Sequence, residues 1–213
     1  MSAITLRHDL RGRFGPARDQ GGRETCLAFA MSDAHAAARG NPWSPLCCEY
    51  LFYHAKQRDQ TPAHQGTTMP AIRAALRLDG QPAETDWPYL KALPANLKDW
   101  KPPRVGTLYR RDSRMSGHAF SEVWDTVEAG QPVLVGMTFS GAFYVPDKDG
   151  VVDADEPEDP NLRHAVLAVA TGKRGKNKRL VRNCWGGTWG LSGYAWVSER
   201  YASPRILVAL TVN

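Results

Sequence analysis

The sequence predicts an α+β protein built from two packed lobes. Helix-forming segments fill the first half of the 213 residues, and short β-type runs between turns rich in Gly, Asp and Pro fill the second half. Because 42% of the chain is apolar and 23% is charged, it can bury a sizeable core. We expect one functional domain over residues 1–213, with a helical lobe at roughly 20–105 and a β lobe at roughly 106–213 that also takes up the N-terminal arm.

Three helices are predicted in the first half. Residues 1–19 are basic and interrupted by glycine and proline, so we expect an irregular arm. The alanine-rich segment 26–38 then predicts a helix, with Thr25 as its cap. A second helix is expected to begin at Ser44, and a third over 69–78 with a proline in its first turn.

The second half predicts one short helix and five strands. Residues 84–103 hold four prolines and two tryptophans and are expected to be irregular. The helix is expected over 120–128, where an Ala-Gly pair closes it. The strands are expected over residues 132–138, 164–170, 179–183, 194–197 and 206–212.

The charge pattern argues against nucleic acid and membrane as partners. The net charge of +5 is modest, and the one dense basic run, residues 173–179, contains glycine and asparagine and is typical of a solvated hairpin turn. No stretch approaches the roughly 20 apolar residues of a membrane span, and the N-terminus has no signal-peptide core.

The four cysteines form no disulfide framework, which favours a reducing, cytoplasmic location. Export as an effector is the alternative.

One cysteine is placed for nucleophilic chemistry. Cys26 opens the first predicted helix, where the helix dipole favours a thiolate. The first-turn amides of a helix lack intrahelical partners, so the Cys26 N–H can stabilise an oxyanion together with a second donor. Gln20, six residues earlier and next to two glycines, carries a suitable side-chain amide.

The base that activates a thiol has to come from another part of the chain. His164 begins a predicted strand after a long polar loop, which places it at a strand end. Asn183 ends the next predicted strand and can orient the imidazole, and Trp185 can screen their hydrogen bond from water. A cysteine, a histidine and an orienting amide together predict an activated thiol nucleophile.

No metal or cofactor is expected. The acidic segment 147–156 fits a calcium loop only in part, because Val145 holds the first ligand position, and a solvated turn is the favoured interpretation. Cys47 and Cys48 are adjacent and have no further ligand at chelating spacing, so they are interpreted as structural.

Three segments resemble the motifs of papain-like (C1) cysteine peptidases. Residues 20–30 resemble the segment with the oxyanion glutamine and the nucleophile, 164–169 resemble the histidine strand, and 183–194 resemble the Asn-Ser-Trp-Gly signature. Residues 86–89 resemble a Trp-Pro-Tyr turn of bacterial members. The resemblance spans roughly residues 14–213 and implies a papain-like fold, with a helical left lobe, a β-barrel-like right lobe and a cleft between them.

The resemblance also implies a role for each site residue. The implied catalytic residues are Cys26 as nucleophile, His164 as general base and acid, Asn183 as its orienting partner, and Gln20 as oxyanion donor. The implied residues on the substrate side are Gly66, Arg163 and Trp185. A thiol protease that hydrolyses protein or peptide substrates is therefore expected.

Departures from the motifs leave alternatives open. Arg23 stands where the family often has a disulfide-bonded cysteine, Leu27 replaces a tryptophan, and Arg163 precedes the histidine. We expect that no propeptide precedes the domain, so that control would come from a partner such as a protein inhibitor or an immunity protein. A toxin or effector role is a further hypothesis. The alternatives are a deamidase, transglutaminase or isopeptidase with the same triad, and an inactive peptidase-fold binding module.

Overall fold

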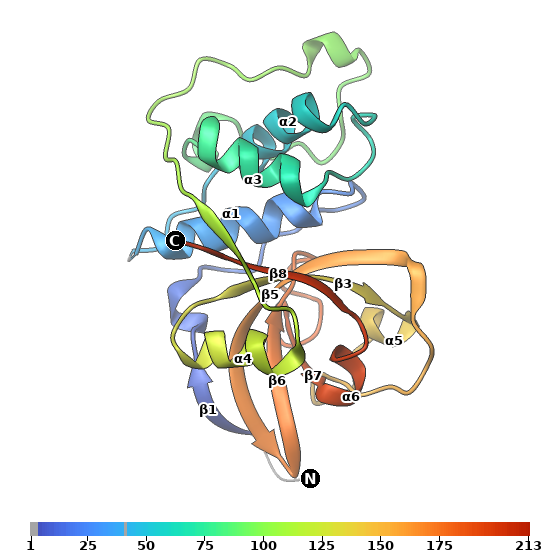
Figure 1. Ribbon diagram of the computed structural model, residues 1–213. Helices are drawn as coiled ribbons and strands as arrows, with labels where there is room; N and C mark the ends of the chain where they lie inside the picture. Colours follow the sequence, from blue (N-terminus) through green and yellow to red (C-terminus); the bar gives the residue numbers. More distant parts are fainter. Residues whose placement is uncertain (1–3, 41) are drawn as a thin grey trace. The chain divides into compact units, whose positions relative to one another are not determined.

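The structure is a computed structural model that describes residues 4–40 and 42–213 (Figure 1). The chain forms two compact units. The β unit comprises the chain up to Asp19 together with Arg114–Thr211, and the helical unit comprises Gln20–Ser113 with Val212–Asn213. No helix of the described residues is long and apolar enough to cross a bilayer.

The helical unit contains three α-helices, named α1 (Cys26–Ala38), α2 (Cys48–Asp59) and α3 (Met69–Leu78). Two short 3₁₀ turns, Glu84–Asp86 and Leu97–Asp99, interrupt the irregular segment that follows them. Helix α1 is buried on nearly all sides, which explains its small alanine side chains. The predicted helices at 26–38 and 69–78 are confirmed.

Helix α2 begins four residues later than the predicted start at Ser44. Leu46 forms a bridge with Ala83, and the Cys47 N–H donates to the Pro82 carbonyl at 3.0 Å, so the backbone is extended there. Cys47 then caps α2, because its Sγ accepts a hydrogen bond from the N–H of Tyr50 at 3.2 Å.

Thr25 is the cap of α1 as predicted, but through its backbone and not through its side chain. Thr25 is the N-cap residue, and its carbonyl accepts the Phe29 N–H at 3.0 Å, but its side chain makes no capping bond. Its Oγ1 lies instead 2.8 Å from the hydroxyl of Tyr89. In α3, by contrast, the Thr68 side chain does cap the helix by accepting the Ala71 N–H.

The β unit is a mostly antiparallel sheet with three short helices. The strands follow the order β2-β8-β3-β5-β6-β7-β4, and β1 pairs separately with β5. Only the β4–β7 pair is parallel among the described pairs. The strands are β1 (Thr5–Asp9), β2 (Ser113–Ser116), β3 (Val133–Phe139), β4 (Val151–Val152), β5 (Asp159–Arg174), β6 (Lys176–Arg182), β7 (Tyr194–Ser198) and β8 (Ile206–Val212); the helices are α4 (Phe120–Glu128), α5 (Gly141–Tyr144) and α6 (Glu199–Ala202).

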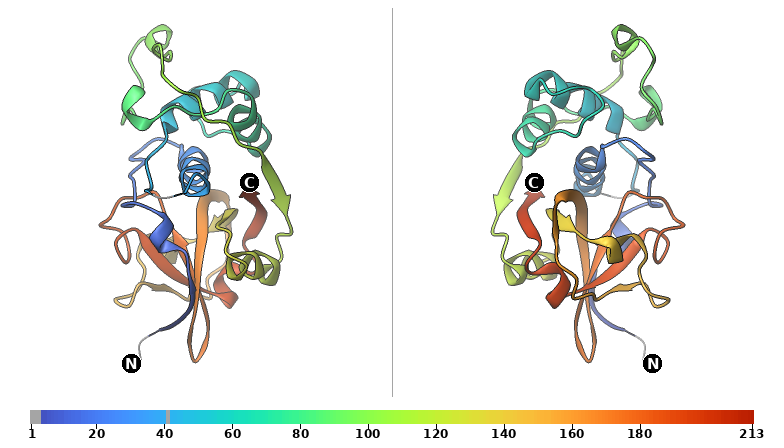
Figure 2. Two further views of the ribbon diagram at one scale, coloured as in Figure 1. Left: turned by 90° about the vertical axis from the view of Figure 1, so that its left-hand side faces the viewer. Right: turned by 90° about the vertical axis from the view of Figure 1, so that its right-hand side faces the viewer.

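The five predicted strands and the predicted helix at 120–128 are all present. The long strand β5 is the centre of the unit, since it pairs with β1, β3 and β6 (Figure 2). The prediction of an irregular arm is wrong for Thr5–Asp9, which forms β1 against the end of β5. This edge strand is largely exposed, so its sequence lacks the apolar alternation that indicates a strand.

Candidate active site

Cys26 is the first residue of α1 and is partly exposed. Its position at the N-terminus of a 13-residue helix is the one the sequence predicts. The helix dipole favours a negative charge at this end, and the first-turn amides point toward it. The thiol of Cys26 is therefore held where a thiolate and a neighbouring oxyanion are both stabilised.

The loop before Cys26 is fixed by Tyr89. The Tyr89 hydroxyl donates to the carbonyl of Gln20 at 2.8 Å and accepts from the Thr25 hydroxyl at 2.8 Å. Its ring packs edge-on against Phe29 of α1, with 4.7 Å between the centroids. The Gln20 side-chain amide is buried and donates to the Arg23 carbonyl at 2.7 Å, which sets the direction of that amide.

Arg23 forms a buried ion pair within the helical unit. Its guanidinium donates to both carboxylate oxygens of Glu49, at 2.6 and 3.0 Å, and to the Leu90 carbonyl at 2.6 Å. Glu49 is fully buried and also accepts the Trp100 indole N–H at 2.7 Å. This network joins the loop before Cys26 to α2 and to the irregular segment, at the position where the family often has a disulfide.

His164 lies within β5 of the β unit, opposite Met137 of β3. The prediction that it begins a strand is wrong, because β5 already begins at Asp159, in the segment expected to be a polar loop. Its Nε2 lies 2.6 Å from Oδ1 of Asn183, which follows directly after β6. The N–H of Cys184 donates to the same oxygen at 2.8 Å, which identifies that atom as the acceptor. Nε2 therefore carries the hydrogen, and Nδ1 is the basic nitrogen of the neutral ring.

Aromatic side chains surround the His164–Asn183 pair. The Trp185 ring lies 4.7 Å from the imidazole, and those of Phe139 and Phe143 lie 5.8 and 6.1 Å away. Tyr144 stacks on Trp185 almost in parallel, with 5.2 Å between the centroids. This shell screens the histidine–amide bond from water and keeps the imidazole in one orientation.

Burial lowers the pKa of His164 to about 4, while the hydrogen bond with Asn183 acts in the opposite direction. The ring is therefore neutral at pH 7, with its lone pair on Nδ1. A negative charge placed beside the ring would raise this pKa.

Both polar groups of the Gly66 backbone are engaged inside the helical unit. Its N–H donates to the Glu24 carboxylate at 2.7 Å, and its carbonyl accepts from the Lys56 ammonium at 2.8 Å. Arg163 of the β unit is exposed beside His164, and its guanidinium bonds only weakly to the Pro160 carbonyl at 3.4 Å.

The site residues thus fall into two groups, one in each unit. Gln20, Cys26 and Gly66 belong to the helical unit, and Arg163, His164, Asn183 and Trp185 belong to the β unit. Sequence reasoning assigned no role to Glu24, Glu49 or Tyr89. The Trp-Pro-Tyr turn drew attention to Tyr89, but its bond to Gln20 spans 69 positions, and no local pattern indicates it.

The acidic segment that suggested calcium forms a hydrogen-bonded turn. Asp147 Oδ1 accepts the N–H groups of Asp149 and Val151, and Glu156 accepts from Ser140 and Ala142. Over residues 4–40 and 42–213, no three His, Cys, Asp or Glu side chains are grouped so as to hold a metal.

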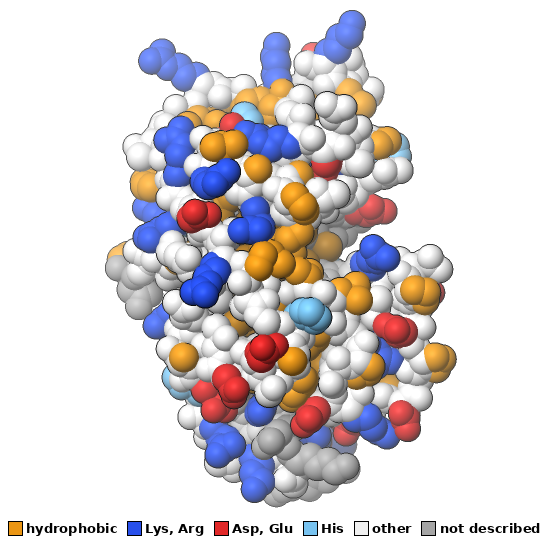
Figure 3. Space-filling model, viewed as in Figure 1, with side chains coloured by type: hydrophobic (Ala, Val, Ile, Leu, Met, Phe, Trp, Pro, Cys, Tyr) orange, Lys and Arg blue, Asp and Glu red, His pale blue; other side chains and the backbone are white. Residues whose placement is uncertain are grey.

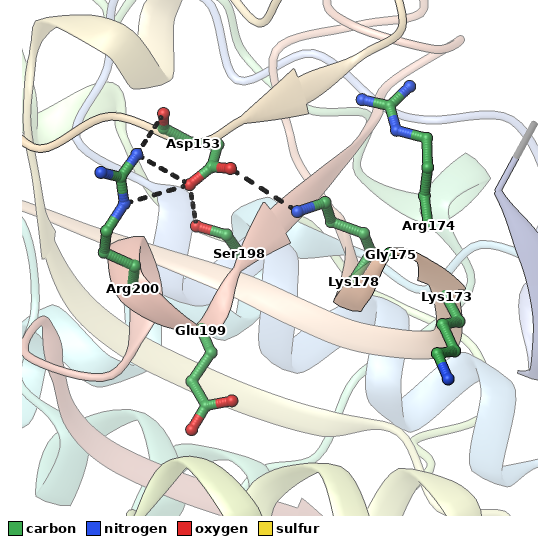
Figure 4. A pocket seen from close by; sticks show the side chains of 8 residues that line it. All are labelled: Asp153, Lys173, Arg174, Gly175, Lys178, Ser198, Glu199 and Arg200. Atoms are coloured by element: carbon green, nitrogen blue, oxygen red, sulfur yellow. Dashed lines mark hydrogen bonds and ion pairs between the residues drawn. The ribbon is translucent and has the colours of Figure 1, made fainter. Parts of the chain in front are cut away.

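A polar pocket in the β unit contains none of the site residues (Figure 4). Asp153 lies at its centre and accepts from Ser198 at 2.6 Å and Arg200 at 3.2 Å, with the Lys178 ammonium at 3.6 Å. These paired charges connect β7, α6 and the hairpin between β5 and β6. On the molecular face drawn in Figure 3, side chains of both signs are present.

The chain belongs to the papain family of cysteine proteases, whose family model matches residues 4–206. It is 26% identical over 207 residues to cathepsin J of Mus musculus, covering 88% of this chain and 58% of the relative. It is 29% identical to the oryzain gamma chain of Oryza sativa subsp. japonica, covering 86% and 51%. The chain therefore spans less than two thirds of the length of these relatives.

Solved structures confirm the papain-like α+β fold. Xylellain, a cysteine protease from Xylella fastidiosa, superposes with a TM-score of 0.80 at 18% identity, covering 99% of this chain and 87% of the other. Procathepsin L 3 from the larval midgut of Tenebrio molitor gives a TM-score of 0.76, also at 18% identity, covering 99% and 70%.

Proposed function

We propose that the protein is a cysteine peptidase that hydrolyses peptide bonds through a thioester on Cys26. The observation that carries the proposal is the buried bond between His164 Nε2 and Asn183 Oδ1, which leaves Nδ1 as a basic nitrogen. An imidazole held in that tautomer by an amide is what an activated thiol requires. The position of Cys26 at a helix N-terminus favours the thiolate form that acts as the nucleophile.

In the proposed reaction, the Cys26 thiol transfers its proton to His164 Nδ1, and the sulfur attacks the scissile carbonyl carbon. The resulting oxyanion accepts hydrogen bonds from the Cys26 N–H and the Gln20 amide. The C–N bond then breaks, and the leaving amine takes the proton from His164, which leaves a thioester. A water molecule, deprotonated by His164, attacks the thioester and releases the carboxylic acid and the thiol.

Asn183 would act by keeping the ring in one tautomer and orientation throughout this cycle. When His164 is protonated, the Nε2–H bond to Asn183 strengthens, because a charged donor forms a stronger hydrogen bond. Trp185 and Tyr144 would keep water away from that bond. Arg163 and Gly66 are proposed to lie on the substrate side, and Glu24 and Lys56 hold the Gly66 backbone for that purpose.

A thiol-directed epoxide tests the proposal. We expect the wild-type protein to be labelled at Cys26 and to cleave members of a peptide library, whereas Cys26→Ala does neither. Replacing the catalytic thiol should reduce kcat by a factor of about 10⁴ or more. The control is Cys48→Ala, which removes a buried thiol that donates weakly to the Ala28 carbonyl at 3.8 Å and should leave labelling intact.

Two other results would redirect the proposal. Release of ammonia or attachment of an amine, without cleavage of the peptide chain, would indicate one of the related acyl-transfer enzymes: a deamidase, a transglutaminase or an isopeptidase. Each of these enzymes can use the same thioester on Cys26. A folded wild-type protein that is neither labelled nor active under reducing conditions would indicate a binding module instead.

We further propose that the protein works in a reducing compartment under the control of a protein inhibitor or immunity partner. All four cysteines are free thiols, which supports the compartment. The effector hypothesis is tested by expression in host cells. Toxicity that disappears in Cys26→Ala would support it, and equal growth with both proteins would contradict it.

A further inference from the structure

An exposed carboxylate lies two residues before the nucleophile. Glu24 and Cys26 are separated by one residue, so their Cα atoms are at most about 7 Å apart. Glu24 is exposed, whereas the next residue, Thr25, is 1% exposed and faces Tyr89. The Glu24 carboxylate is therefore exposed to solvent near the start of α1, and is not buried with Thr25.

The carboxylate is also held in place. Its Oε2 accepts the Gly66 N–H at 2.7 Å, which is the length of a strong charge-assisted bond. Gly66 is itself fixed, because its carbonyl accepts from the Lys56 ammonium at 2.8 Å. Asp59 lies 3.3 Å from that ammonium and accepts the Thr61 N–H, so the 61–66 loop is tied to α2.

Neighbouring cations are already neutralised by other carboxylates. Arg23 is paired with Glu49, and Lys56, whose side chain is 2% exposed, is paired with Asp59. Within the part of the chain that the structure describes, Glu24 has no basic partner and bonds only to the Gly66 N–H. A fixed and uncompensated negative charge beside a nucleophile attracts a positive group on the substrate.

We propose that Glu24 selects substrates with a lysine or arginine whose carbonyl forms the thioester. The carbonyl carbon of that residue is bonded to the Cys26 sulfur, so its long side chain starts within reach of Glu24. The Gly66 N–H holds Oε2, and Oε1 faces the incoming ammonium or guanidinium. This inference rests on the proposed peptidase activity and names its substrate class.

Two N-acetylated fluorogenic peptides test the inference. They are identical except that the residue before the scissile bond is arginine in one and citrulline in the other, which has the same shape without the charge. We expect kcat/KM to be about fivefold higher for arginine, the upper end of the range for an exposed ion pair. The ratio should fall toward one at high salt, because ions screen exposed pairs.

The variant that removes the charge is Glu24→Gln, whose amide oxygen can still accept the Gly66 N–H. It should bring the arginine-to-citrulline ratio of kcat/KM close to one, because only the arginine peptide loses an opposite charge. The control is Asp99→Asn, which removes one exposed negative charge from the same unit. That variant should keep the wild-type ratio.

The failures of the two proposals are distinguishable. Cleavage with a ratio near one in the wild type, or with an unchanged ratio in Glu24→Gln, would overturn the inference and leave the peptidase intact. An equal gain for both peptides in Glu24→Gln would also overturn it, because Glu24 would then only occupy the Gly66 N–H. A wild-type protein without epoxide labelling or cleavage would overturn the peptidase proposal itself.

Discussion

Two buried histidines show how the partners of a side chain decide its role. Burial lowers the pKa of both His35 and His164 to about 4. His164 bonds to Asn183 among aromatic rings and keeps a basic nitrogen. His35, in α1, bonds through Nδ1 to Gln81 Oε1 at 2.9 Å, and Gln81 in turn donates to Ser32 at 2.9 Å. This second network connects helices and loops and contains no nucleophile, so His35 has a structural role.

The His35 pKa predicts acid sensitivity of the helical unit. Its folded pKa of about 4 lies below the unfolded value of 6.5, so the unfolded state binds more protons between these values. The free energy of unfolding should therefore fall by about 3 kcal/mol as the pH drops from 7 to 4. His35→Gln has no imidazole to protonate, so its free energy of unfolding should lack this pH dependence. The difference in unfolding free energy between wild type and His35→Gln, measured by urea titration, should therefore be about 3 kcal/mol smaller at pH 4 than at pH 7. The exposed His118→Gln variant should follow the wild type, and a constant His35→Gln deficit across this pH range would contradict the prediction.

At the scale of elements, local pattern predicts a helix well only where local interactions set its ends. The segments 26–38 and 69–78 were predictable, because alanine content and apolar spacing determine them. The start of α2 was not, because it depends on the pairing of Leu46 with Ala83, 37 positions apart along the chain. Arg23 illustrates the same limit. The sequence shows only that Arg23 replaces a cysteine common in the family. It does not reveal the ion pair, because the partner, Glu49, lies 26 positions away.

The Arg23–Glu49 pair predicts a large stability loss when one partner is removed. Glu49→Gln should lower the free energy of unfolding by about 3 kcal/mol, because it leaves a buried guanidinium without its counter-charge. The double variant Arg23→Met/Glu49→Leu should recover much of this loss, since two apolar side chains leave no buried charge. Urea denaturation measures both. If the loss of unfolding free energy in the double variant equals the sum of the losses in the two single variants, the two side chains do not interact.

At the scale of the molecule, the chain enters the helical unit after Asp19 and returns to the β unit at Arg114. The fold class and the strands follow from composition and periodicity. The site does not, because His164 and Asn183 meet only when β5 and β6 pair. Without that pairing, His164 is one residue within a strand and Asn183 one that follows a strand, and only the resemblance to a family joined them to Cys26. The catalytic assignments remain predictions to be tested by the variants above.

Arg182 predicts how the N-terminal arm is held to the β unit. This side chain is 2% exposed and donates to the carbonyls of Gly15 and Pro16 at 2.9 and 2.8 Å, and to the Tyr194 hydroxyl at 2.7 Å. Arg182→Met should destabilise the unit by about 3 kcal/mol, because it removes the charged donor that the Gly15 and Pro16 carbonyls and the Tyr194 hydroxyl share. Amide exchange over residues 10–19 should then accelerate.

The control for this experiment is Arg13→Met. Arg13 bonds to the Gly130 carbonyl at 2.8 Å at a more exposed position, so its loss should change exchange in the arm much less. Unchanged protection of residues 10–19 in Arg182→Met would show that the paired strand β1 alone holds the arm.

The contact of Trp185 with His164 has a spectroscopic consequence. An indole beside an imidazole emits less light when that imidazole gains a positive charge, because the cation accepts electron density from the excited ring. The two ring centroids are 4.7 Å apart, so the fluorescence of Trp185 reports the protonation of His164. Its emission, obtained as the difference from a Trp185→Phe protein, follows the charge of the base with no substrate present.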